Sequence, residues 1–227
     1  MSIILGLKWR LLYVKETRES KICRSKGIKM HNTIKQLMLF LIFLSLTHCA
    51  TLPPPAQNQN ITRGSRVQTL SKIQSWNLQG AVGVRSPQDS FSADLNWEQR
   101  GQNYTISLFG PFGASSFVLT GQPNQVHLAL SDGRKFTAQN PESLIEEQLH
   151  WRLPVSNLHY WIRGLPVPGI AAQSQFDQYH HITTLNQQGW VVQFLRYTAE
   201  NGVDLPTKIV LTNPQLNVKI VVSQWRF

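Results

Sequence analysis

The side chains best suited to chemistry are two adjacent histidines, His180 and His181, with Asp177 close by in the sequence. Imidazole and carboxylate groups are common ligands of zinc. Neighbouring residues of a strand point to opposite faces of a sheet, so the two imidazoles are not expected to share one ion. The sequence therefore predicts no metal site at this position.

Other catalytic patterns do not appear in the sequence. It contains neither a Gly-x-Ser-x-Gly motif nor a cysteine–histidine pairing suited to nucleophilic catalysis. Glu146 and Glu147 lie on a predicted helix and are expected to face solvent. Gly80 and Gly83 interrupt a predicted strand, where they are expected to allow bending rather than to bind phosphate. We expect no enzymatic activity and no cofactor.

Cys49 follows a nearly continuous apolar run at residues 37–46, which is preceded by Lys35. Such a run is too short to span a bilayer but suits the core of a secretory signal. A cysteine in this position resembles a bacterial lipobox, in which signal cleavage leaves a lipid-modified cysteine at the new N-terminus. His48 departs from the small residue that usually precedes that cysteine. We expect Cys49 to be lipidated.

Four segments are predicted from these signals. Residues 1–29 are a basic leader or follow a misplaced start, and residues 30–48 are a lipoprotein signal peptide. Residues 49–62 hold the lipidated cysteine and a tether rich in Pro, Gln and Asn, a composition typical of an extended linker. Residues 63–227 are the folded body.

Most of the positive charge lies outside this folded body. The chain has a net charge of +10, and residues 1–48 supply +7 of it through nine Lys/Arg and two Glu. Residues 49–227 carry thirteen Lys/Arg and ten Asp/Glu, a balance of only +3 without a basic cluster. The composition therefore argues against nucleic-acid binding.

Apolar and polar residues alternate from Trp76 to Leu130, a pattern typical of strands with one buried face. Turn residues at 100–102 and 131–133 separate the runs, so neighbouring strands are expected to pair antiparallel. Further strands are predicted at residues 179–184, 190–197, 205–211 and 216–225.

Three short helices are predicted around these strands. Residues 63–73 form an amphipathic pattern, Asn140 and Pro141 begin a second helix, and a third runs from 156 to a stop at Gly164. A sandwich, a closed barrel and an open curved sheet all remain compatible with this order. Helices between sheet segments favour the last: a mainly β, antiparallel curved sheet forming an open half-barrel, with the helices covering its concave side.

The chain is rich in large apolar side chains that either pack a core or line a cavity for an apolar ligand. For Trp225 both interpretations, core packing and cavity lining, stay open. The predicted cavity residues are Trp76, Leu95, Trp97, Ile106, Leu108, Leu119, Leu128, Trp161 and Trp190.

Phe112 lies between the turn-forming residues Pro111 and Gly113, at the connection between two predicted strands. A large apolar residue in such a place either folds back onto the sheet or points outward. Leaving the Phe112 side chain in water forfeits about 1.5–3 kcal/mol of hydrophobic stabilisation. An outward-pointing Phe112 is therefore expected to have a function.

Several runs together resemble the LolB family of outer-membrane lipoprotein receptors. The resemblance covers residues 49–227. The runs that carry it are Trp76–Arg85, Leu95–Trp97, Leu108–Gly113, Leu153–Pro154, Leu158–Pro166, Gly189–Trp190, Leu205–Pro206 and Trp225.

This resemblance implies a half-barrel of about eleven strands with helices over its concave mouth. It implies a receptor that accepts triacylated lipoproteins from a LolA-like periplasmic carrier and places them in the outer membrane. Phe112, Pro111 and Gly113 would then form a membrane-insertion loop. The expected partners are the carrier, the acyl chains of its cargo and outer-membrane lipids, with the receptor acting as a monomer. The alternative is a lipid-anchored scaffold that binds a protein partner through the same apolar surface.

Overall fold

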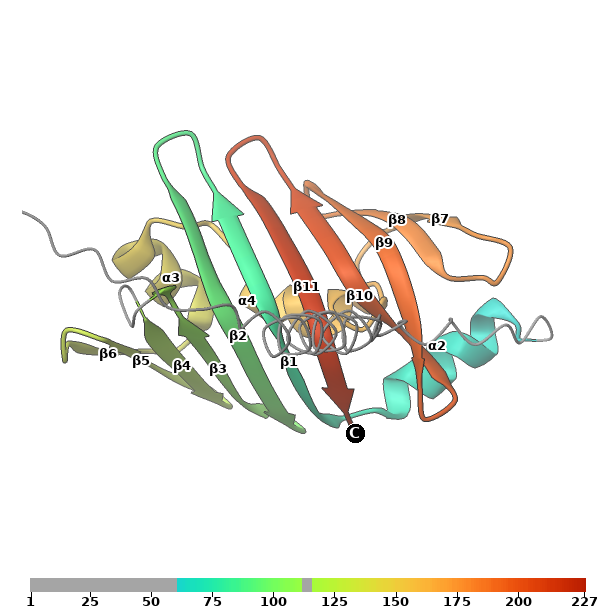
Figure 1. Cartoon of the computed structure of the whole chain (residues 1–227), viewed down its shortest axis with the longest axis horizontal. Helices are drawn as coiled ribbons and strands as arrows, with labels where there is room; N and C mark the ends of the chain where they lie inside the picture. The colour runs from blue at the N-terminus through green and yellow to red at the C-terminus, as the bar shows by residue number, and fades with distance from the viewer. Residues whose placement is uncertain (1–60, 112–115) are drawn as a thin grey trace, which may run out of the picture. The chain divides into compact units, whose positions relative to one another are not determined.

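One antiparallel sheet of eleven strands dominates residues 61–111 and 116–227, the part of the chain that this computed structural model describes (Figure 1). The strand order is β6-β5-β4-β3-β2-β1-β11-β10-β9-β8-β7. The two outermost strands, β6 and β7, do not pair with each other, so the sheet is open rather than closed into a barrel. The predicted fold class is confirmed.

The strands are β1 (Ser75–Arg85), β2 (Ser90–Arg100), β3 (Asn103–Phe109), β4 (Phe117–Gln122), β5 (Gln125–Leu130), β6 (Lys135–Ala138), β7 (Gln173–Phe176), β8 (Ile182–Gln187), β9 (Trp190–Glu200), β10 (Val203–Thr212) and β11 (Asn217–Arg226). The helices are α2 (Arg63–Lys72), α3 (Pro141–Leu149) and α4 (Val155–Trp161).

The sheet is built from two meanders that meet in its centre. Strands β1 to β6 follow one another as neighbours, and so do β7 to β11. Pairing of β1 with β11, with Val82 opposite Ile220, joins the two halves. Helices α3 and α4 come between the halves in sequence and lie over one face of the sheet (Figure 1).

The alternation of buried and exposed residues along each strand identifies the face of the sheet that α3 and α4 cover. In β2, Ala93, Leu95 and Trp97 are buried, whereas Ser92 and Asp94 are exposed. Since successive side chains of a strand point to opposite faces, one face collects the apolar residues and the other meets water. The apolar face and the helices together form the core.

Local capping explains where helices α2 and α3 begin. At α2, Thr62 Oγ1 accepts a hydrogen bond from Ser65 N at 3.2 Å. At α3, Asn140 Oδ1 accepts one from Ser143 N at 2.9 Å, and Pro141 occupies the first turn, as the sequence predicts. These contacts satisfy backbone N–H groups that a helix start leaves without partners. Among the described residues, no helix is both long and apolar enough to span a membrane.

The strand predicted at residues 179–184 is wrong in its first half. Residues up to His181 form a turn in which Asp177 Oδ1 accepts hydrogen bonds from Tyr179 N and His181 N, each at 2.9 Å. An aspartate that bonds its own following backbone competes with sheet pairing. Strand β7, at Gln173–Phe176, was not predicted, because its sequence is mostly polar and short.

The segments predicted at 1–29 and 30–48, and the tether up to residue 60, lie outside the described residues. Cys49, Phe112 and Gly113 also lie outside them, so their predicted roles stay predictions.

Two glycines of β1 differ in the room available to a side chain. A Cβ at Gly80, where the register with β11 shifts, would lie 2.1 Å from Val221 O, whereas the nearest atom at Gly83 is Ser92 Oγ at 3.8 Å. We expect Gly80→Ala to lower the free energy of unfolding by about 1–3 kcal/mol. Gly83→Ala should change it by less than about 0.5 kcal/mol. Urea unfolding of both variants tests this difference, and equal losses would contradict it.

Candidate functional site

A small apolar cavity lies between the sheet and the two helices α3 and α4. Its volume is about 60 Å³. Its lining residues are all of apolar types: Val82, Val84, Leu95, Trp97, Ile106, Leu108, Phe117, Leu119, Ile145, Trp151, Leu153, Val155, Leu158, Val218 and Ile220.

Strand alternation and helix packing place these side chains around the cavity. The register sets Leu95 opposite Leu108, and Ile106 opposite Leu119, so inward-facing residues of neighbouring strands form continuous rows. From the other side, Ile145 of α3 and Leu158 of α4 close the space. Cross-strand neighbours on one face lie about 4.5–5.5 Å apart at Cβ, which packs them into a closed apolar wall.

Five of the nine predicted cavity residues line this space, and four do not. Those that line it are Leu95, Trp97, Ile106, Leu108 and Leu119.

The other four predicted residues are buried elsewhere in the core. Leu128 is fully buried in β5. Trp161 and Trp190 pack against each other with ring centroids 6.3 Å apart, and Trp161 Nε1 donates to Gln187 Oε1 at 2.9 Å. Trp76 joins an aromatic cluster that borders the cavity rather than lining it.

In this aromatic cluster, Trp76 lies 5.0 Å from Trp97 and 5.3 Å from Trp225, measured between ring centroids. Trp225 Nε1 donates to Pro206 O at 3.0 Å, which anchors the cluster to β10. His159 of α4 stacks on Trp76 at 6.5 Å. Trp97 belongs both to this cluster and to the cavity wall, so for this residue the two sequence interpretations are not exclusive.

Sequence reasoning missed the lining residues of the α3–α4 connector, Trp151 and Leu153. The connector, residues 150–154, has no periodic pattern that would assign its side chains to a face. Val218 and Ile220 were also missed, although the alternation in β11 could have identified them. The helices were predicted only as a cover, and the structure adds that they supply part of the wall.

The cavity is too small to hold an acyl chain as it stands. Its 60 Å³ compares with about 300–1,000 Å³ for typical ligand pockets. The side chains of the wall nearly fill the space between sheet and helices. Accommodating a chain therefore requires the helices or their connector to move away from the sheet.

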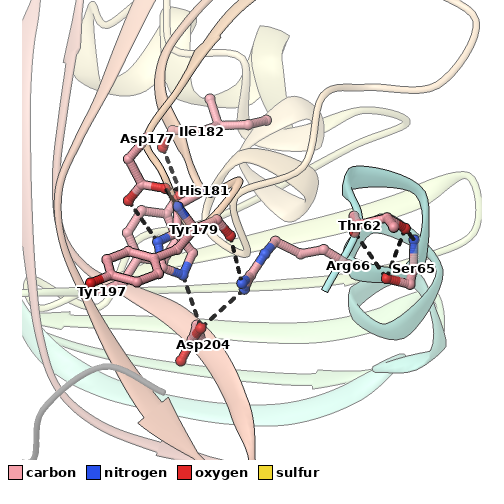
Figure 2. A network of polar contacts seen from close by, with 9 residues as sticks. All are labelled: Thr62, Ser65, Arg66, Asp177, Tyr179, His181, Ile182, Tyr197 and Asp204. Carbon is pink, nitrogen blue, oxygen red and sulfur yellow. Dashed lines mark hydrogen bonds and ion pairs between the residues drawn. The ribbon is translucent and has the colours of Figure 1, made fainter. Parts of the chain in front are cut away.

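A polar network near α2 contains the histidine and aspartate that were weighed as metal ligands (Figure 2). His181 Nδ1 lies 2.8 Å from Asp177 Oδ2, and its Nε2 lies 2.9 Å from Asp204 Oδ2. The His181 ring stacks on Tyr197 with centroids 4.3 Å apart. Both ring nitrogens are thus engaged by carboxylates. His180 lies in the preceding turn, so strand alternation is not what separates the two histidines.

Arg66 ties helix α2 into the same network. Its Nη1 donates to Asp204 Oδ2 at 3.2 Å and its Nη2 to Tyr179 O at 3.0 Å. The guanidinium thus places a positive charge beside the Asp204 carboxylate. Within the two described stretches of chain, no cluster of three or more His, Cys, Asp or Glu side chains could hold a metal ion. The network is a structural link between α2 and the β8–β10 end of the sheet.

Removing Asp204 should be costly, because its side chain is only 1% exposed and serves both Arg66 and His181. We expect Asp204→Ala to lower the free energy of unfolding by about 3–5 kcal/mol, since two buried polar partners lose their acceptor. Asp94→Ala, at an exposed aspartate on the outer face of β2, is the matched control and should cost less than about 0.5 kcal/mol. Urea unfolding measures both, and similar losses would argue against the network.

His159 should make stability depend on pH. Burial lowers the pKa of His159 to about 4, and the positive charge of Arg163 acts in the same direction. The unfolded chain, with an ordinary histidine pKa of about 6.5, binds a proton that the folded state does not. The contribution of His159 is therefore fully present above about pH 6.5 and is lost as pH falls toward 4. His159→Gln should show a shallower loss of unfolding free energy across this window, and an unchanged slope would contradict the assignment.

The chain is similar in sequence to the proteins of one family. The profile of the family described as "LolB: Outer membrane lipoprotein LolB" matches residues 74–225. The outer-membrane lipoprotein LolB of Coxiella burnetii (strain RSA 493 / Nine Mile phase I) is 40% identical over 194 residues, which are 84% of this chain and 92% of the relative. The outer-membrane lipoprotein LolB of Ectopseudomonas mendocina is 38% identical over 202 residues, 85% of this chain and 97% of the relative.

Among solved structures, a LolA superfamily protein from Nitrosomonas europaea gives a TM-score of 0.48 at 8% identity, covering 74% of this chain and 94% of that one. The family profile and the curated relatives each span most of the folded body. The chain belongs to the LolB family of outer-membrane lipoproteins.

Proposed function

We propose that the protein is an outer-membrane receptor that accepts triacylated lipoproteins from a LolA-like periplasmic carrier and inserts them into the outer membrane. Its relatives carry the name outer-membrane lipoprotein LolB, which supports the location and the receptor role. The structural observation that carries the proposal is the wholly apolar wall between an open sheet and two short helices. The receptor acts as a monomer in this proposal.

An apolar site explains how such a cargo can move without an energy source. Burial of hydrocarbon stabilises by about 0.8 kcal/mol per methylene, so a ~16-carbon chain left in water forfeits about 12 kcal/mol. Passing the chain from one apolar cavity to another, and then into a bilayer, avoids that barrier. Only small differences in affinity between successive sites are then needed.

The polar contacts between helices α3 and α4 and their connector are exposed and weak. Arg152 Nε lies 2.6 Å from Glu146 Oε1, but both side chains are largely exposed. Glu142 Oε1 accepts a hydrogen bond from Ser156 N at 2.8 Å, also at the surface. Exposed ion pairs contribute about 0–1 kcal/mol each. These two contacts lie within the helices and their connector, whereas Trp161 Nε1 of α4 donates to Gln187 Oε1 of the sheet at 2.9 Å. Apolar contact is the main interaction that holds α3 and the connector on the sheet, and an acyl chain can replace that contact.

Lipidation of Cys49 would anchor the receptor to the outer membrane. Stable anchoring needs two or more acyl chains, and the family's lipidated cysteine carries three. The segment 49–62 would then be the tether of the folded body. These assignments concern residues outside the described part of the chain, and palmitate incorporation at Cys49 supports or refutes them.

The connection between β3 and β4 is the proposed membrane-insertion loop. Phe109 at the end of β3 is 50% exposed, and Pro111 beside it is exposed as well. An exposed aromatic next to the proposed loop of Pro111, Phe112 and Gly113 adds to the apolar surface available there. Outer-membrane lipids are the partner that we propose for this loop.

Phe112→Glu should leave the fold intact and block release of lipoprotein into membranes, because a carboxylate cannot be buried cheaply in hydrocarbon. Phe112→Leu, which keeps the side chain apolar, is the matched control and should deliver normally. Transfer from a lipoprotein-loaded carrier to outer-membrane vesicles measures release, and capture of cargo by each variant is measured separately.

This experiment also separates the receptor from the alternative, a lipid-anchored scaffold. The small volume of the cavity in the empty protein is the observation that favours a scaffold. Normal delivery by Phe112→Glu would contradict the role assigned to Phe112. Failure of the unmodified protein to capture any lipoprotein would contradict the receptor role and leave the scaffold.

A further inference from the structure

The indole ring of Trp151 closes one end of the apolar cavity. Trp151 lies on the connector between α3 and α4, the two helices that cover the sheet (Figure 1). Its ring centroid is 5.3 Å from that of Phe91 and 6.4 Å from that of Phe117. Phe91 and Phe117 are themselves 6.3 Å apart, so the three rings form one aromatic group at the cavity wall.

The strand register shows which end of the cavity this aromatic group closes. Phe91 pairs with Val84, which is the last inward-facing residue of β1. Phe117 pairs with Leu108, which is the last inward-facing residue of β3. The rings therefore lie at the end of the strands from which the β3–β4 connection, with Pro111, departs. The closed end of the cavity is the end nearest the proposed membrane-insertion loop.

Trp151 reaches the cavity from a short connector whose other apolar contact with the core is made by Leu153. The connector spans only residues 150–154 and begins at His150, whose φ of 58° ends α3. Its neighbour Arg152 makes an ion pair on the exposed side. Trp151 itself is partly buried and packs against the core. Aromatic and apolar contacts therefore fix its position, and these are contacts that a hydrocarbon chain can replace.

We propose that Trp151 is a plug at the acyl-chain entrance of the cavity, and that the first methylenes of an incoming chain take the place of its ring. The inference rests on the proposed function and adds the residue that regulates access to the cavity. Binding a chain requires the indole to leave its site between Phe91 and Phe117. Return of the indole then favours release of the chain, at the end of the cavity that faces the membrane.

This role has a measurable consequence for affinity. In the unmodified protein, part of the binding free energy of a chain is used to displace the ring from a partly buried site. Trp151→Ala removes that opposing contribution and leaves the entrance open. We expect the variant to bind cis-parinaric acid, a fluorescent fatty acid, about tenfold more tightly than the unmodified protein.

Two variants separate the plug from general loosening of the connector. Arg152→Ala removes the neighbouring ion pair with Glu146 but keeps the indole, and it should bind the fatty acid as the unmodified protein does. Trp151→Phe keeps a smaller ring in place and should show a smaller gain in affinity than Trp151→Ala. A merely structural role for Trp151 would lower stability in Trp151→Ala and Trp151→Phe without raising affinity in either.

A second readout does not depend on the alanine variant. Bromine atoms quench tryptophan fluorescence on contact, so dibromostearate should quench the unmodified protein more strongly than Trp151→Phe. Equal quenching, together with unchanged affinity in Trp151→Ala or Trp151→Phe, overturns the plug while leaving the apolar site in place. Absence of fatty-acid binding by the unmodified protein and by every variant overturns the plug and counts against the proposed acyl-chain site as well.

Discussion

Apolar contact between the inward face of the sheet and the α3–α4 segment is the interaction on which the rest of the structure depends. It forms the core, sets the size of the cavity and, together with the buried hydrogen bond from Trp161 Nε1 to Gln187 Oε1, holds the helices in place. Because the hydrophobic effect is non-directional, one hydrocarbon surface can substitute for another without leaving unpaired donors or acceptors. A protein that exchanges its own side chains for a guest chain benefits from that property.

The buried polar contacts stabilise a different part of the molecule from the cavity wall. The Arg66–Asp204–His181 network lies near α2, away from the cavity wall, and joins the first helix to the β8–β10 end of the sheet. Arg163 of the α4 end donates to Leu70 O and Ile73 O, which fixes the end of α2 as well. Directional bonds thus fix α2 and the C-terminal end of α4, whereas apolar contact is the main interaction that holds α3 and the α3–α4 connector on the sheet.

Much of the fold could be predicted from the sequence because alternation and capping are local signals. The helix start at Asn140–Pro141 and the strand pattern around Leu95 were correct for that reason. The cavity wall was only half predicted. Burial alone does not distinguish Trp161, which packs on Trp190, from Trp97, which faces the cavity. Trp151 depends on a connector whose path is set by tertiary packing, and no spacing in the sequence encodes it.

The two edge strands of an open sheet present unpaired backbone N–H and C=O groups. Long, apolar edge strands can pair with strands of other molecules, so open sheets with such edges tend to aggregate into fibres. Here each margin is only four residues long: β6 carries Lys135, and β7 reads Gln-Ser-Gln-Phe. The open sheet therefore exposes little template for uncontrolled self-assembly through its edges.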